Sequence, residues 1–295
     1  MTQTVIYRTN TVYQEPVTLV ASKNIRATIM PGPLEFARAV PIQLHVQGAV
    51  RMTLGVERHR TTDGQFLVIS YIRDPNAGPV EKGAFTGYPR RVDAALATAQ
   101  VAALILLSHP GLIAEKVFDG VVSDPQNVTF HPEGPLTIST PHMLDPVELS
   151  ASVQERLALV DTFDETKQSR FRLSSRWFLR GHEAKKPVDR FLYWFIALEV
   201  YPAEGRTKVV SAVRNLLVAT VYPDVSPGLL SERLSIGRIH GIRSRIVHEG
   251  LSHVDLPLDP EFHQALDKLG AISAVCLRVL AGLSPGDDLD RWVRA

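Results

Sequence analysis

The spacing of apolar residues changes once along this chain, close to Pro146, and that change limits the possible folds more than any other feature. Before it, three short runs show the β-branched content and part of the alternation that are typical of strands: residues 17–20, 42–46 and 65–69. After it, apolar residues recur at the three-to-four-residue spacing of one helix face. The first of them are Leu149, Val153, Leu157 and Val160.

This pattern predicts an α+β protein, with a β-rich α/β domain followed by an all-α domain. Residues 92–107 are apolar on nearly all sides, which indicates one helix packed against the sheet. Two further strands are expected at residues 120–122 and 135–138, because both are short apolar runs next to turn residues.

Proline punctuates the chain between the two halves, and we place the domain boundary between Thr140 and Asp145. The β-rich domain is then residues 1–143 and the helical domain is residues 144–295. Helices are expected over residues 149–160, 171–180, 187–199, 208–220, 234–250 and 262–280, with a short turn in the tail.

Composition excludes a protein that attracts nucleic acid over its whole surface. Of the 295 residues, 45% are hydrophobic and 21% charged, which is ordinary for a folded chain, and the formal net charge is +1. Any contact with nucleic acid must therefore depend on local positive charge.

Cys276 is the one cysteine, so an intrachain disulfide cannot form, and its apolar neighbours indicate a buried thiol. The first ten residues lack the apolar core of a signal peptide, and the longest apolar run, residues 94–107, is too short to span a bilayer. We therefore expect a cytoplasmic protein without membrane contact. The scattered histidines lack the spacing of metal ligands, so no metal or other cofactor is expected.

Residues 191–198 are all apolar or aromatic, so their helix should lie at the centre of the helical domain. Glu199 follows directly. If it is buried, its carboxylate needs a partner; otherwise it reaches solvent. Three arginines are candidate partners, Arg214, Arg243 and Arg245.

The segment of residues 241–250 combines an apolar stripe with charged side chains. Ile239, Ile242 and Ile246 recur at helical spacing, and Gly250 is suited to end the helix. Four side chains lie off the stripe: Arg243, Arg245, His248 and Glu249.

Arginine and histidine together suit phosphodiester chemistry. His248 can take or give a proton near neutral pH, and Arg243 can stabilise charge that develops on a phosphate. On an ideal helix they lie about 140° apart, so a site that uses both needs either a bent Arg243 side chain or a second copy of the helix, and hence a homodimer. The Arg-x4-His pattern alone is weak, because ordinary surface residues also produce it. Similar pairs are Arg176 with His182 and Arg233 with His240.

The expected helix at residues 171–180 carries a basic series. Its members are Arg170, Arg172, Arg176 and Arg180. The series is either a solvated helix face or a track for RNA phosphates, and on the second interpretation Arg172, Arg176 and Arg180 bind RNA.

Three short motifs occur in order in the second half of the chain. They are Arg176-Trp177, then Asp189-Arg190-Phe191 leading to Ile196-Ala197-Leu198-Glu199, then Arg243-Ser244-Arg245-Ile246-Val247-His248. Together they resemble the Apea-like branch of the HEPN superfamily. The general layout is also similar to that of methylamine utilization protein J proteins.

The HEPN resemblance implies a helical bundle that dimerises and brings Arg243 and His248 to the interface. It implies a metal-independent endoribonuclease that leaves a 2′,3′-cyclic phosphate and acts in phage defence or as a toxin in a stress response. Glu199, Arg245 and Glu249 are the expected supporting residues. The superfamily also includes non-catalytic modules that bind RNA, a nucleotide or a protein partner. The second resemblance implies instead an accessory protein of a metabolic operon.

Overall fold

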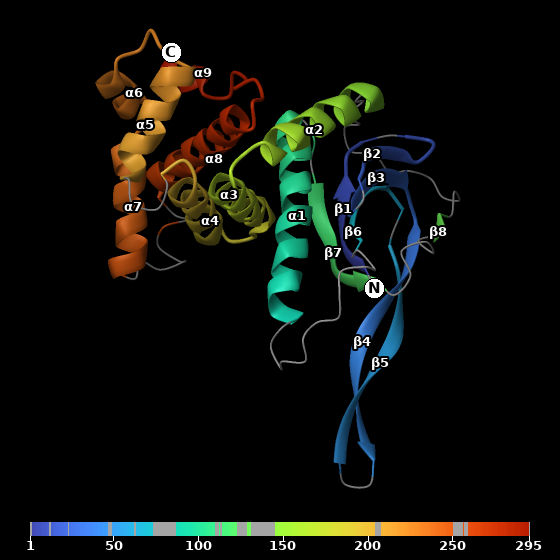
Figure 1. The fold of residues 1–295 in the computed structure, drawn as a ribbon. Helices are drawn as coiled ribbons and strands as arrows, with labels where there is room; N and C mark the ends of the chain where they lie inside the picture. The colour runs from blue at the N-terminus through green and yellow to red at the C-terminus, as the bar shows by residue number, and fades with distance from the viewer. Residues whose placement is uncertain are drawn as a thin grey trace. The chain divides into compact units, whose positions relative to one another are not determined.

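The computed structural model describes residues 2–11, 13–22, 24–46, 49–61, 63–72, 87–109, 112, 114–122, 129–130, 145–203, 208–249, 256 and 259–294. For residues 38–46, 49–56, 87–93, 121–122 and 129–130 it describes the backbone alone. The chain is an α+β protein, with an antiparallel sheet and one helix followed by a helical region (Figure 1).

The chain divides into two compact units, Met1–Gln154 and Glu155–Ala295, and the division falls inside helix α2 (Pro146–Asp161). Residues 131–144, which include the expected domain boundary and the expected strand at residues 135–138, lie outside the described residues. The two units are described separately below.

The first unit is built on an eight-stranded antiparallel sheet in the order β2-β3-β6-β1-β7-β4-β5, with β8 paired to β4 (Figure 1). The strands are β1 (Thr2–Thr9), β2 (Val17–Ala21), β3 (Ile25–Pro31), β4 (Leu34–Val46), β5 (Ala49–Arg60), β6 (Gln65–Tyr71), β7 (Ala114–Val122) and β8 (Thr129–Phe130). The β4–β5 hairpin is the longest pairing and extends beyond the other strands in Figure 1.

The predicted strands at residues 17–20 and 65–69 are confirmed as β2 and β6, and those at 42–46 and 120–122 are the ends of longer strands. Sequence reasoning missed β1, β3 and β5. The reason is clearest for β1: it lies inside the sheet, and four successive residues from Thr4 to Tyr7 are buried. A strand that is buried on both faces loses the alternation by which strands are recognised.

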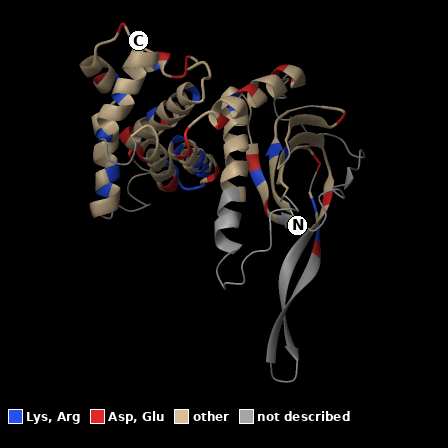
Figure 2. Cartoon of the chain, in the orientation of Figure 1, with Lys and Arg blue, Asp and Glu red and all other residues tan. Residues whose placement is uncertain are grey.

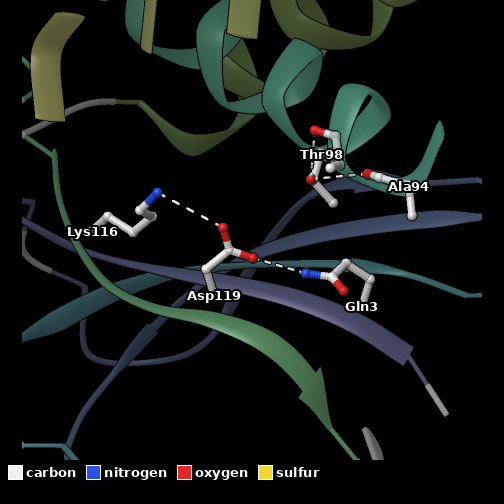
Figure 3. Close-up of polar contacts among 6 residues, drawn as sticks. Gln3, Ala94, Thr98, Lys116 and Asp119 are labelled. Carbon is white, nitrogen blue, oxygen red and sulfur yellow. Dashed lines mark hydrogen bonds and ion pairs between the residues drawn. The ribbon is translucent and has the colours of Figure 1, made fainter. Parts of the chain in front are cut away.

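Helix α1 (Gly87–Ser108) packs along β6, β1 and β3, which confirms the predicted helix on the sheet (Figure 1). Figure 3 shows three local contacts in this unit. The Gln3 amide of β1 donates to Asp119 of β7 at 2.8 Å, and Lys116 pairs with the same carboxylate at 3.7 Å. The Thr98 hydroxyl donates to the Ala94 carbonyl at 3.0 Å inside α1, so this buried polar group is satisfied.

The second unit is helical. Its helices, after the end of α2, are α3 (Glu165–Glu183), α4 (Pro187–Val200), α5 (Val209–Thr220), α6 (Pro227–Arg233), α7 (Ile236–Glu249), α8 (Pro260–Leu280) and α9 (Asp290–Val293). Helix α4 contacts α3, α5, α7 and α8, which confirms the prediction that it is central. Helix α6 lies between two of the predicted helices and is not among them; the Ser226 hydroxyl caps it and Pro227 begins it.

Trp194 explains why α3, α4 and α8 approach so closely. Its indole lies against two glycines, and a Cβ atom at Gly181 or Gly270 would come within 2.3 or 2.8 Å of the ring. Its Nε1–H donates to the Phe178 carbonyl at 3.2 Å, so the buried ring also has its polar partner. Trp194 is therefore the side chain around which three helices of this unit pack.

Two further predictions concern the single cysteine and the membrane. Cys276 is fully buried, as expected, and burial raises the pKa of its thiol to about 12. Among the described helices, none is both long and apolar enough to cross a membrane.

Candidate functional site

Helix α7 carries the residues that the sequence singled out, and its buried side anchors it to the bundle. Ile236, Ile239 and Ile242 are buried and Ile246 is half-buried, so the predicted apolar stripe is confirmed. The helix ends at Glu249, and the proposed capping residue Gly250 lies outside the described residues. The register of this stripe decides which of the polar side chains point away from the core.

Arg243 forms the ion pair that Glu199 was expected to need. Its Nη2 lies 3.0 Å from Glu199 Oε1, and the two side chains are 27% and 33% exposed. The guanidinium carbon also lies 5.8 Å from the centre of the Phe195 ring. Glu199 therefore both reaches solvent and pairs with an arginine of α7. Arg214, another candidate partner, donates instead to the side-chain oxygen of Asn215.

His248 is exposed in the last turn of α7, next to an exposed pair in which Arg245 Nε lies 3.8 Å from Glu249 Oε2. Such an i, i+4 pair contributes about 0.3–0.5 kcal/mol and is screened by salt. Arg243 is half-buried against α4, whereas His248 faces away from the core, so the structure does not bring the two together within one helix. This arrangement is consistent with the angle of about 140° between the two residues on an ideal helix.

His240 was not considered as a partner of Arg243, although it lies one turn earlier on α7. Its ring centre is 6.1 Å from that of Phe195, the same ring that Arg243 covers. The i, i+3 spacing places His240 and Arg243 about 60° apart, which is closer than Arg243 and His248. The sequence therefore contains this histidine–arginine pair, but in the order His-x2-Arg and not in the order Arg-x4-His.

The other two arginine–histidine pairs noted in the sequence are involved in packing. Arg233 donates to the Val293 carbonyl, and Lys268 donates to the Arg233 carbonyl at 2.7 Å, so Arg233 joins α6 to the C-terminal segment. The His182 ring makes edge contacts with the rings of Phe178 and Trp194, although the residue is exposed. Desolvation by these neighbours, together with the positive charge of Arg190, lowers the pKa of His182 to about 4.

Among the described residues, nothing packs against one face of α7 at its two glycines. Gly237, Gly241, Ser244 and His248 follow one another at i, i+4, i+7 and i+11, so they lie along one line of the helix. A Cβ atom added at Gly237 or Gly241 would meet nothing within 4 Å. Val247, beside this line, is 50% exposed. This line is called the open face below.

The basic series on α3 forms a second group. Arg172, Arg176 and Arg180 are spaced by four residues, so they follow one side of the helix, and Arg180 is exposed. The guanidinium carbon of Arg180 lies 4.9 Å from the centre of the Trp177 ring. Lysine and arginine positions are marked along both α3 and α7 in Figure 2.

Among the described residues, no group of three or more acidic, histidine or cysteine side chains could hold a metal ion. No protein-family model matches the sequence, and no curated protein or solved structure is significantly similar to it.

Proposed function

We propose that the helical unit is a metal-independent endoribonuclease of the HEPN type, which works as a homodimer with α7 at its interface. The observation that carries this proposal is the open face of α7, a line of small side chains that ends in the exposed His248. Small residues let two helix backbones approach closely. A second copy of α7 laid against this face would bring groups from both copies near His248.

In this proposal Arg243 binds the scissile phosphate and stabilises its charge in the transition state. The ion pair with Glu199 supports that role, because it holds the guanidinium through Nη2 and leaves its other N–H groups available. His248 takes the proton of the ribose 2′-OH, or gives one to the leaving oxygen. The 2′-oxygen attacks phosphorus, the 5′-oxygen leaves with a proton, and a 2′,3′-cyclic phosphate results.

Within the same proposal the protein acts in the reducing cytoplasm, in phage defence or in a toxin-like stress response. The buried free thiol of Cys276 suits that compartment, since it has no partner for a disulfide in this chain.

One observation favours a second function, an RNA-binding module that does not cut. Arg243 and Arg245 already lie beside the carboxylates of Glu199 and Glu249. A phosphate would have to compete with these carboxylates for the two arginines. This competition counts against a catalytic site on α7 more than against RNA binding at another surface of the helical unit.

The test is cleavage of RNA in EDTA by the wild type, by His248→Ala and by the matched control His263→Ala, which removes an exposed histidine of α8. We expect His248→Ala to lose at least 100-fold in rate, because proton transfer by a positioned side chain contributes about 10²–10⁴-fold. The control should cut like the wild type. Full activity of His248→Ala would contradict the proposed catalytic role, and binding without cleavage by the wild type would favour the second function.

A further inference from the structure

The surface between α3 and α4 carries an aromatic pair that the proposed catalytic site does not use. The ring centres of Trp177 and Tyr193 lie 5.5 Å apart with 34° between their planes, and both side chains are half-buried. Trp177 stands two turns before the end of α3, and Tyr193 stands two turns after the start of α4. The two rings therefore lie at the same level of an antiparallel helix pair.

The charges near this pair are mixed: Asp189 lies one turn before Tyr193 on α4, but two arginines of α3 have no carboxylate partner among the described residues. Neither Arg176 nor Arg180 forms an ion pair with a described residue, in contrast to the arginines of α7. The α3–α4 connection adds the exposed Lys185 and Lys186. A guanidinium group such as that of Arg180, beside a partly exposed ring and without a described carboxylate partner, is suited to a ligand that has both a flat ring and a negative charge.

We infer that Trp177, Tyr193 and Arg180 form a stacking site for an unpaired base of single-stranded RNA, with Arg176 on the adjacent phosphate. This inference names the substrate of the nuclease proposed above and rests on that proposal for its biological setting. The chemistry is that of sequence-independent single-strand binding, in which aromatic faces stack on bases and a positive groove follows the backbone. A paired base in an A-form helix would present no free face to these rings.

The charge at the site favours RNA over a protein partner. Neither Arg176 nor Arg180 pairs with a described carboxylate, and unmatched guanidinium groups suit a polyanion. The Arg180 guanidinium carbon lies 4.9 Å from the centre of the Trp177 ring. A base that binds here would therefore join an existing arginine–tryptophan stack.

The test measures binding of a labelled 2′-O-methyl oligouridylate by fluorescence anisotropy. That oligonucleotide lacks the 2′-OH that cleavage needs, so the measurement does not depend on nuclease activity. The variants are Trp177→Leu and the rescue variant Trp177→Tyr. The matched control is Trp292→Leu, which removes another half-buried tryptophan that has an arginine, Arg291, over its ring at 3.9 Å.

We expect Trp177→Leu to weaken binding about tenfold, within the range measured for the loss of one stacked base. Trp177→Tyr should bind nearly as the wild type, and Trp292→Leu should bind like it as well. An abasic oligonucleotide of equal length should bind more weakly and should not distinguish Trp177→Leu from the wild type.

Three results would overturn the stacking site: no measurable binding by the wild type, unchanged binding by Trp177→Leu, or an equal loss for the abasic strand. If Trp177→Leu loses binding while His248→Ala still cuts RNA, the stacking site stands and the proposed catalytic role of His248 fails. If His248→Ala is inactive and Trp177→Leu binds normally, the reverse holds.

Discussion

The arginines of α7 and two arginines of α3, Arg176 and Arg180, lie in different electrostatic surroundings. On α7 the three arginines each lie beside a carboxylate: Arg238 beside Glu261, Arg243 beside Glu199 and Arg245 beside Glu249. On α3, Arg176 and Arg180 form no ion pair with a described residue.

The paired and the unpaired arginines suit two different roles: orienting a bound anion and attracting a polyanion from solution. A guanidinium held by a carboxylate keeps a defined orientation, which suits a group that must meet a transition state. Its charge is largely matched, however, so it adds little to long-range attraction. Unmatched arginines attract a polyanion and adapt to it. On the function proposed above, α7 would orient the phosphate and α3 would supply most of the RNA affinity.

The largest expected effect is a loss of stability on changing Trp194 of α4, the helix that contacts both α3 and α7. Helix α4 supports α3 and α7, and Trp194 is the ring that α4 places between Gly181 and Gly270. Trp194→Ala should lower the free energy of unfolding by about 3–5 kcal/mol, because it removes a buried aromatic side chain and leaves a cavity. Urea titration measures this as a lower midpoint. Trp292→Ala, which changes a half-buried ring of α9, should cost clearly less, and an equal cost would mean that Trp194 is not central.

A smaller effect, on the rate of RNA cleavage, should distinguish the half-buried Arg243–Glu199 pair from the exposed Arg245–Glu249 pair. Glu199→Gln releases Arg243, so the rate of RNA cleavage should fall about tenfold, which corresponds to about 1.4 kcal/mol of transition-state stabilisation, while RNA affinity rises slightly. Glu249→Gln releases Arg245 from an exposed pair and should leave the rate unchanged. Equal rates for both variants would show that the Glu199–Arg243 pair does not position a catalytic group.

The smallest effect is in the salt dependence of RNA binding. Arg176→Gln and Arg180→Gln should each reduce the slope of log affinity against log salt by about 0.7, the value for one phosphate contact on a single strand. Arg238→Gln should change the slope little, because Glu261 already matches that charge. A larger change for Arg238 than for Arg180 would reverse the comparison between the two helices.

Much of the helical unit could be predicted from the sequence. The apolar stripe of Ile239 and Ile242 and the apolar run of α4 determine which faces are buried, because helical spacing is a local property. An arginine partner for Glu199 was expected only if its carboxylate is buried; Glu199 is 33% exposed, so the cost of burial does not account for the pair. The sheet was less predictable, since β1 is buried on both faces and its partners β6 and β7 are distant in sequence.

The sequence by itself determined the α+β class, the central helix, the buried thiol and the opposed directions of Arg243 and His248 on one helix. Only the tertiary structure decided which arginine meets Glu199, that His240 lies at the same ring as Arg243, and that Trp177 and Tyr193 form a pair. These contacts join α3, α4 and α7 across connections of varied length. The physical reason is that periodicity specifies the face of a helix, whereas the neighbour of that face depends on the packing of whole helices, here around Trp194 and its two glycines.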